Sequence, residues 1–354
     1  MRLTARSVRL ATLATAAALA LAACSSGSSD DETPADNSSS PAAADAAFPL
    51  TLKNTFGETV IESKPERVAT VAWGNHDVPL ALGVVPVGMA ASTYGDDDDD
   101  QILPWTFEAL QKLGATGDKA PTLFDESDGI DFEAVNDSEP DVVLASYSGL
   151  TKEEWTQLND GIAPTVSYPV YAWGTNWKDM TLINGEAMGL KSEAQAKVDE
   201  VLAQIKDATQ KRPELAGKTF VYTYLDASKP NSLGVYSPLD ARVQLVTDFG
   251  LTVAPSITEL AGSTDQFYFE LSAEQADKIN DVDILVTYGD ENTLALLQAH
   301  PLLGKVRAIK NGAVVVMPSD GPISAATSGP SILSVPWVLD DYLDLFQAAA
   351  KKVG

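Results

Sequence analysis

Two stretches decide the fold: DFEAVNDSEPDVVLASY at residues 131–147 and SAEQADKINDVDILVTY at residues 272–288. Each predicts a short helix that carries a glutamate, Glu133 or Glu274, followed by a strand that begins at an aspartate and ends at a tyrosine. Both strands are short, continuous apolar runs, which are typical of strands buried on both faces of a sheet. The same unit therefore occurs once in each half of the chain.

Further short, valine-rich runs surround these two units and are bounded by Gly, Pro or Asp. They lie at 68–73, 84–90 and 165–170 in the first half and at 220–225, 251–257 and 313–318 in the second. In both halves a helical stretch that ends in glycine precedes the second strand, and glycine is the expected helix stop. We expect an α/β protein with two similar doubly wound lobes and mostly parallel sheets.

A long amphipathic helix is predicted between the two halves. Val198, Val201, Leu202 and Ile205 recur at helical spacing within a segment from Ser192 to Arg212. A helix of about 20 residues is roughly 30 Å long, which is enough to connect two lobes as a stiff strut. The predicted division is a first lobe at 48–177, a linker region with the long helix at 178–213, and a second lobe at 214–354.

The first 23 residues are typical of a secretory signal peptide, because three arginines precede a short run of Ala and Leu. The run ends in Leu-Ala-Ala-Cys and resembles the lipobox of bacterial lipoproteins, in which Cys24 would be acylated. An ordinary signal peptide or a short membrane helix are the alternatives, but the run is shorter than the roughly 20 residues that span a bilayer. Residues 24–47 are rich in Ser, Ala, Pro and Asp, and we expect a disordered tether.

The charge of the chain argues against several classes of partner. Of the 24 lysines and arginines, three lie in the signal peptide, which leaves 21 against 50 aspartates and glutamates. So acidic a protein is not expected to bind nucleic acid or to dock flat on anionic lipid. Cys24 is the single cysteine, so no internal disulfide can form.

The ordered set of phrases along the chain resembles the binding proteins of ABC importers whose lobes are joined by one long helix, and most of all the ferric-siderophore branch. The phrases are KPERVATV, LALGVVPVGM, EPDVVLASYSGLT, IAPTVSYP, YAWGTNW, DARVQLVTDFGL, HPLLGKVRAIKNGAVVVM and SILSVPWVLDDYLDLF. The resemblance implies a class III periplasmic binding protein fold, a monomer, and capture of a ferric siderophore without a cofactor or catalysis. It implies a lipid-anchored protein on the extracytoplasmic face of the cell membrane, with an ABC permease as partner. Glu133 and Glu274 would dock on that permease. The alternative is that they are ordinary solvated carboxylates, but their matched placement in the two halves favours the docking role.

Ligands of open α/β sheets bind beyond the carboxyl ends of the strands, so the segments that follow the strands indicate the site. Aromatic residues recur there, and single Tyr or Trp residues are also common at half-buried edges for other reasons. Together they predict an aromatic cleft between the lobes. The candidate ligand-binding residues are Trp73, His76, Tyr94, Trp105, Tyr147, Trp173, Tyr224, Tyr236, Arg242 and Tyr288.

The histidines and the aspartate run could each indicate a site for a bare metal ion, but neither has the pattern that such a site requires. Only His76 and His300 are present, whereas sites for zinc or manganese combine several histidines with a carboxylate. His76 would line the cleft as a hydrogen-bond donor or lie on the surface. The run Asp96–Asp100 lacks the spaced ligands and glycine of a calcium loop, and five adjacent carboxylates favour a solvated loop. We therefore expect iron to arrive already chelated.

Charge also bears on the kind of chelate. Only four arginines follow Cys24, and a strongly anionic ferric tris-catecholate would need paired cations in the cleft. Arg242 is the best candidate, although it could instead pair with Asp240. A neutral or cationic chelate, such as a hydroxamate or mixed-type siderophore, therefore fits better. Haem or cobalamin is the alternative within the family, with Tyr94 or His76 as a possible haem ligand. An extracytoplasmic enzyme is the alternative from another class, although the common catalytic motifs are lacking.

Overall fold

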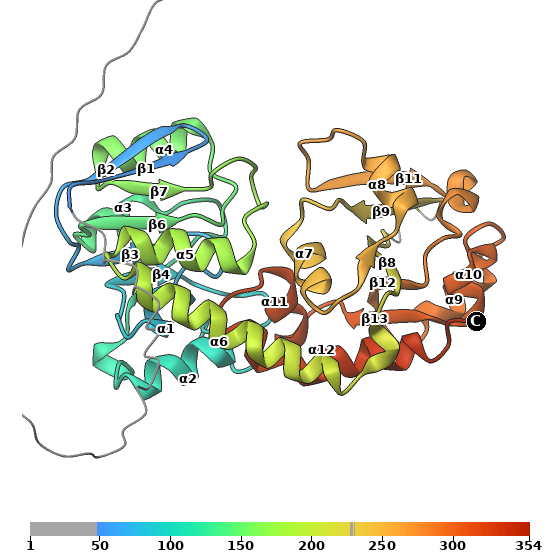
Figure 1. Cartoon of the computed structure of the whole chain (residues 1–354). Helices are drawn as coiled ribbons and strands as arrows, with labels where there is room; N and C mark the ends of the chain where they lie inside the picture. Colours follow the sequence, from blue (N-terminus) through green and yellow to red (C-terminus); the bar gives the residue numbers. More distant parts are fainter. Residues whose placement is uncertain (1–47, 227–228, 230) are drawn as a thin grey trace, which may run out of the picture. The chain divides into compact units, whose positions relative to one another are not determined.

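Two β-sheets, one in each half of the chain, form the centres of the two lobes (Figure 1). The computed structural model describes residues 48–226, 229 and 231–354. These belong to one compact unit, residues 42–354. The predicted signal peptide, Cys24 and the predicted tether lie outside the described residues. No helix in the described part is long and apolar enough to cross a membrane.

The sheet of the first lobe is entirely parallel, with the strand order β5-β4-β3-β6-β7. Its central strands are fully buried, which explains why they read as continuous apolar runs. The strands are β3 (Val68–Thr70), β4 (Gly88–Ala90), β5 (Thr122–Phe124), β6 (Val142–Ala145) and β7 (Thr165–Ser167). The helices are α1 (Asp77–Ala81), α2 (Pro104–Lys112), η1 (Gly117–Lys119), α3 (Phe132–Asp137), α4 (Lys152–Gly161) and α5 (Trp177–Ala187). An antiparallel hairpin of β1 (Leu50–Asn54) and β2 (Gly57–Ile61) precedes them.

The second lobe has a mixed sheet, because an antiparallel pair of strands is added to a parallel core. Its strands are β8 (Thr219–Tyr224), β9 (Ser232–Tyr236), β10 (Thr252–Val253), β11 (Tyr268–Ser272), β12 (Ile284–Gly289) and β13 (Val314–Pro318). Strands β10, β8, β12 and β13 are parallel, while β9 pairs antiparallel with β8 and β11. The helices are α7 (Ala241–Asp248), α8 (Pro255–Ala261), η3 (Ala273–Ile279), α9 (Thr293–Ala299), η4 (Leu303–Lys305), α10 (Arg307–Asn311), α11 (Pro322–Ser328) and α12 (Ser334–Ala350).

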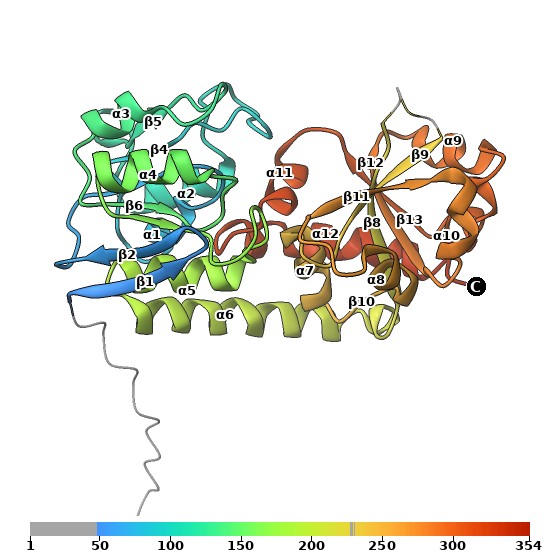
Figure 2. The same cartoon turned by 90° about the horizontal axis from the view of Figure 1, so that it is seen from above.

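The predicted long helix is present as α6, Lys191–Gln210, and it runs along both lobes (Figure 2). Val198, Val201 and Ile205 are buried as the helical spacing predicted, and the chain leaves the helix through η2 (Pro213–Leu215). Helix α12 packs beside α6. Arg212 ties the two together, with its Nη2 2.7 Å from Oδ1 of Asp344. The fold is thus the α/β, two-lobed, helix-linked arrangement predicted from the sequence.

Some predicted strands differ from those observed. The run at 251–257 contributes only Thr252 and Val253 to a strand, because Pro255 begins α8 and proline is favoured at the first position of a helix. Strands β1, β2, β5, β9 and β11 were not predicted, since they are not valine-rich runs like the central strands.

The chain returns from the second sheet to the first lobe before it ends. In the segment after β13, Oδ1 of Asp320 accepts a hydrogen bond from the backbone N of Gly95 at 3.1 Å. Further on, Ser331 donates a hydrogen bond to the buried Asp77, and the ring of Trp337 lies 5.3 Å from that of Trp105. Residues of the predicted second lobe, 214–354, therefore contribute to the packing of the first.

Candidate functional site

A cavity of about 760 Å³ lies where strand ends and loops of both lobes meet. The first lobe contributes Trp73 and Tyr94, and the second lobe contributes strand ends, α7, α9 and the end of α11. The lining residues are Trp73, Tyr94, Tyr224, Leu225, Asp226, Tyr236, Arg242, Tyr288, Gly289, Thr293, Leu296, Leu297, His300, Leu303, Ser319 and Ser328. Such a volume suits a small-molecule ligand.

Trp73 and Tyr94 form the wall of the cavity on the side of the first lobe. Their rings are stacked, with centroids 5.9 Å apart and planes 14° apart, and Trp73 is 48% exposed. Trp73 lies in the turn after β3. The residue before it, Ala72, has a φ of 59°, which turns the chain just beyond the end of the strand. The backbone N of Ala72 donates to Oε2 of Glu126 at 2.9 Å, which holds this turn. An exposed indole is thereby presented to a ligand.

Arg242 is the single lysine or arginine that lines this cavity among the described residues, and its charge is already paired. Its Nε lies 2.8 Å from Oδ1 of Asp240, which is fully buried. The guanidinium also lies 4.0 Å from the centre of the Tyr236 ring, a cation–π contact. Burial raises the pKa of Asp240, and the positive charge of Arg242 opposes this shift. The pair is neutral as a whole when both groups are charged.

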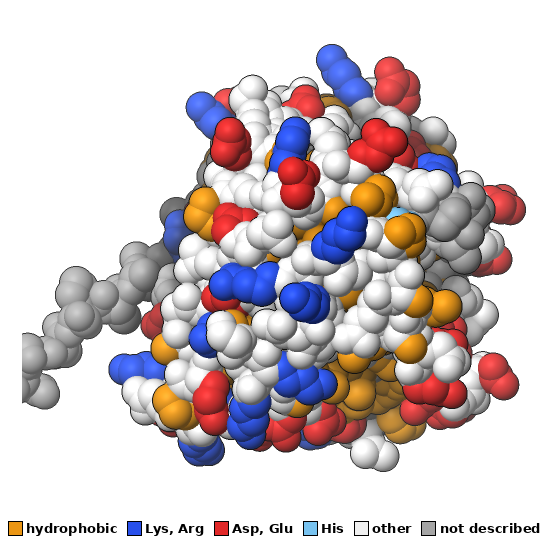
Figure 3. All heavy atoms as spheres, turned by 90° about the vertical axis from the view of Figure 1, so that its right-hand side faces the viewer, with side chains coloured by type: hydrophobic (Ala, Val, Ile, Leu, Met, Phe, Trp, Pro, Cys, Tyr) orange, Lys and Arg blue, Asp and Glu red, His pale blue; other side chains and the backbone are white. Residues whose placement is uncertain are grey.

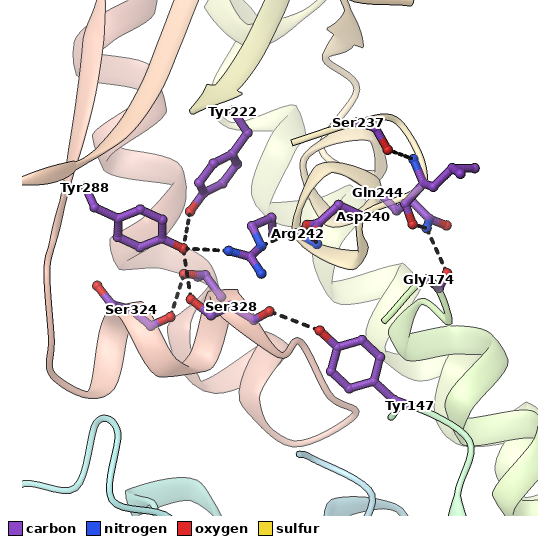
Figure 4. A network of polar contacts seen from close by, with 12 residues as sticks. Tyr147, Gly174, Tyr222, Ser237, Asp240, Arg242, Gln244, Tyr288, Ser324 and Ser328 are labelled. Carbon is purple, nitrogen blue, oxygen red and sulfur yellow. Dashed lines mark hydrogen bonds and ion pairs between the residues drawn. The ribbon is translucent and has the colours of Figure 1, made fainter. Parts of the chain in front are cut away.

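The hydroxyl of Tyr288 is the centre of a polar network at the base of the cavity (Figure 4). Its oxygen lies 2.9 Å from Oγ of Ser328 and accepts from Tyr222 at 3.3 Å and from Nη1 of Arg242 at 3.5 Å. Tyr147 reaches the same place from the first lobe, since its hydroxyl donates to the carbonyl of Ser328. These contacts link residues of both lobes into one polar floor.

Tyr94, Tyr147 and Tyr236 remain neutral phenols at physiological pH. Burial raises the pKa of Tyr236 to about 12, against the opposing charge of Arg242. Burial also raises the pKa of Tyr94 and of Tyr147. Neutral phenols offer hydrogen-bond donors and aromatic faces to a ligand, and no negative charge.

Trp73, Tyr94, Tyr224, Tyr236, Arg242 and Tyr288 thus line the large cavity, while the other candidates lie elsewhere. Tyr147 is buried, and its ring packs edge-on against Trp173 at 5.3 Å. Trp173 in turn lies 6.2 Å from the ring of Trp73. Trp173 therefore packs between Trp73 and Tyr147, and neither Tyr147 nor Trp173 lines this cavity or the smaller one described next.

His76 and Trp105 line a second cavity of about 250 Å³ in the first lobe, whose wall also includes Trp73 and Tyr94. His76 is not on the surface: it is 2% exposed, and burial lowers its pKa, so it is neutral at pH 7. The indole N–H of Trp105 donates to Asp77 at 2.8 Å and is not free for a ligand. The sequence placed both at strand ends but could not show that α1 and α2 turn them inwards.

The large cavity also has a wall of aliphatic side chains, which the sequence analysis did not predict. Leu296, Leu297 and Leu303 come from α9 and the turn after it, and Leu296 is 69% exposed. His300 lies beside them, but its Nδ1 accepts hydrogen bonds from the backbone N of Leu302 and Leu303. The phrase AHPLLG in the sequence indicated only a helix end, since a leucine pattern does not distinguish core from ligand contact.

The aspartate run has a local role in the structure. Asp96 accepts from the backbone N of Asp98 and Gln101, and Asp100 accepts from Ile102, so the run organises its own loop. Among the described residues, Asp96, Asp97 and Asp98 form the single group that could hold a metal ion, and they are largely exposed. Exposed carboxylates of this kind are typical of a solvated loop.

Comparison with known proteins decides the family. The sequence model of the periplasmic binding proteins matches residues 68–320. The chain belongs to the periplasmic binding protein family. Among periplasmic binding proteins of known structure, PiaA of Streptococcus pneumoniae in complex with ferrichrome is 43% identical, with a TM-score of 0.81. The match covers 86% of this chain and 99% of that one.

Two further periplasmic binding proteins extend the comparison. The ferric-anguibactin-binding protein FatB of Vibrio anguillarum is 25% identical over 313 residues, or 85% of this chain and 88% of FatB. Staphylococcus aureus SirA complexed with staphyloferrin B is 20% identical, covers 84% of this chain and 98% of SirA, and has a TM-score of 0.63. At that identity, the likeness to SirA shows a shared fold.

Proposed function

We propose that this protein captures a ferric siderophore in the large cavity, and that the ligand is a hydroxamate or mixed-type chelate. The observation that carries the proposal is the aromatic cavity whose one lysine or arginine, among the residues that the structure describes, is paired with a buried carboxylate. Aromatic faces and neutral phenols suit a large chelate with a partly apolar surface. PiaA, 43% identical, is known in complex with ferrichrome, in which three hydroxamates neutralise one iron(III).

The charge balance of the cavity supports a ligand without strong negative charge. A ferric tris-catecholate carries a net charge of about −3, and its burial requires cations that are not already engaged. Arg242 supplies one positive charge, and Asp240 balances it. The outer surface does not decide this point, because lysines and arginines are interspersed with acidic residues even at the end of the second lobe (Figure 3).

Delivery to an ABC permease and attachment to the membrane complete the proposed function. PiaA is also described as an iron-uptake ABC transporter substrate-binding protein, in a structure 41% identical to this chain with a TM-score of 0.78. An acylated Cys24 would hold the protein on the extracytoplasmic face of the cell membrane, as a monomer and without catalytic activity.

Glu133 and Glu274 are the proposed contacts with the permease. Each is the second residue of its helix, directly after a cap formed by Asp131 in α3 and by Ser272 in η3. Both glutamates are exposed, and neither forms an ion pair with another described residue. Their equivalent positions on the two lobes would let two arginine-bearing sites of a permease bind both lobes at once.

A fluorescence titration tests the ligand. The chain beginning at Ser25 is titrated with ferrichrome, a ferric tris-catecholate, haem and cobalamin, and with the iron-free siderophores. We expect saturable quenching by ferrichrome at sub-micromolar concentration, since Trp73 lies exposed in the cavity wall. If only haem or cobalamin binds, the fold assignment stands but the proposal of a ferric siderophore as the ligand is wrong. Binding of none of them would favour the enzyme alternative.

Two tryptophan variants locate the binding site. Trp73→Phe is expected to remove most of the quenching and to weaken binding by about tenfold, as loss of an aromatic anchor does. Trp337→Phe is the matched control, because Trp337 is 36% exposed and lies outside the cavity beside Trp105. Equal effects of both variants would show that the signal does not come from this cavity.

A further inference from the structure

The smaller cavity in the first lobe contains two hydrogen-bond acceptors that the fold leaves unused. Nδ1 of His76 and Oε1 of Glu126 are buried and have no hydrogen-bond partner among the described residues, and both residues line this cavity. The cost of burying such groups without a partner is expected to be recovered only when a ligand supplies one. The cavity therefore has the features of a binding site for a ligand group that donates hydrogen bonds.

The neighbouring carboxylate explains why His76 offers an acceptor. Nε2 of His76 faces Oδ1 of Asp77 at 3.7 Å, which favours the tautomer with its proton on Nε2. Asp77 itself already accepts three hydrogen bonds, from Trp105, Thr106 and Ser331. In the tautomer that the Asp77 charge favours, Nδ1 of His76 is left as an acceptor.

Glu126 supplies the charge. Oε2 already accepts from the backbone of Ala72, so Oε1 is left for a ligand. Burial, together with the charges of Asp131 and Glu154, raises the pKa of Glu126 to about 7, against the opposing effect of the hydrogen bond from Ala72. The titratable groups around Glu126 are Asp131 and Glu154 from α3 and α4, and Asp77, Asp125, His76 and Tyr94 in the cavity wall. All of these except His76 and Tyr94 are carboxylates.

We infer that this cavity is a subsite for a protonated amine arm of the siderophore, held by Glu126 and His76. The inference rests on the proposed function, because the arm must extend from an iron chelate in the large cavity. Trp73 and Tyr94 line both cavities, so the stacked pair is the wall that the two share, and an arm that passes it enters the subsite. About 250 Å³ is room for a short aliphatic amine, since one water occupies about 30 Å³ of liquid.

A matched pair of ligands tests the subsite. Ferrioxamine B, a linear iron(III) trihydroxamate that ends in a primary amine, is compared with its N-acetylated form, which lacks that positive charge and carries an added acetyl group. The pH dependence and the Glu126 variant separate the effect of charge from that of size. We expect the amine form to bind about tenfold more tightly at pH 8, as for a charge-assisted hydrogen bond. The preference falls towards equality at pH 6, where Glu126 is protonated and the amine still charged.

Variants and proton release assign the effect to Glu126. Glu126→Gln keeps an acceptor for Ala72 and is expected to abolish the preference for the amine, whereas the exposed Glu108→Gln is expected to keep it. In the unmodified protein, calorimetry in two buffers should show proton release at pH 7 with the amine form and not with the acetylated form. Equal affinities at pH 8, or a preference that survives Glu126→Gln, would overturn the subsite. Failure of ferrichrome to bind as well would overturn the proposed function itself.

Discussion

Asp240 and Arg242 are two residues apart in the sequence, and they place a pair of opposite charges at the large cavity. Asp240→Asn keeps a side-chain oxygen that can cap α7 and leaves Arg242 as an unbalanced cation. We expect the affinity for a ferric tris-catecholate to rise about tenfold relative to ferrichrome, and stability to fall by about 3 kcal/mol. Competitive titration and chemical denaturation measure the two effects.

Asp248→Asn is the control for this variant. Asp248 ends the same helix, α7, and pairs with Lys178 outside the cavity. The control therefore also loses an ion pair but does not change the charge of the cavity, so its ligand preference should stay that of the unmodified protein. If Asp240→Asn left the preference unchanged, the argument that charge balance selects the chelate would be wrong.

The aromatic candidates were identified from their positions after predicted strands. The direction in which each side chain points could not be predicted from the sequence. Trp73 and Trp105 have the same chemistry and lie near the same edge of one sheet. Trp73 stays exposed because of the turn at Ala72, while Trp105 lies in the first turn of α2 and is drawn to the buried Asp77. These partners are distant in sequence, so no local pattern could separate the two roles.

Helix α11 joins the lobes through a close contact with the loop that carries Tyr94. Gly95 has φ of 85°, and a Cβ there would lie 2.2 Å from Cβ of Ala325. Gly95→Ala should therefore destabilise the protein by about 2 kcal/mol or more and weaken ligand binding, because the loop and α11 must move apart. Gly83→Ala is the control, since Gly83 has φ of 80° and nothing within 4 Å of the added Cβ. Thermal unfolding and ferrichrome affinity of the pair separate the steric effect from the backbone strain of about 1 kcal/mol that both share.

The secondary-structure elements that the sequence predicted best are those that are buried all round or strongly amphipathic. The central strands β3, β6, β8 and β12 and the long helix α6 belong to this group. The hairpin β1–β2 and the strands β9 and β11 have alternating or mixed burial, and their pairing depends on contacts rather than on composition. Because β9 and β11 were not predicted, the antiparallel part of the second sheet was not predicted either.

The two lobes are connected by more than the helix α6, and this limits how far they can separate. Asn176 donates to Oε1 of Gln244 at 3.1 Å, and Trp177 donates to Asp248 at 2.9 Å, both between the end of the first lobe and α7. The contacts of Asp77, Gly95 and Tyr147 with the chain around α11 add to these. Since a helix lacks the hinge strands that permit wide closure, the ligand is expected to change the lobe arrangement only slightly.

A nearly rigid molecule can present two docking residues at a fixed separation, and this leads to the last prediction. Replacing both Glu133 and Glu274 by arginine should leave the affinity for ferrichrome unchanged, because neither residue lines the large cavity or the smaller one. Iron uptake by cells should fall at least tenfold, since each reversal sets like charges against each other at the permease. Glu153→Arg with Glu259→Arg is the control: it makes the same change in net charge at exposed helical positions, one in each lobe. Equal loss of uptake in the control would attribute the effect to net charge, and full uptake in the first variant would show that the permease binds the protein elsewhere.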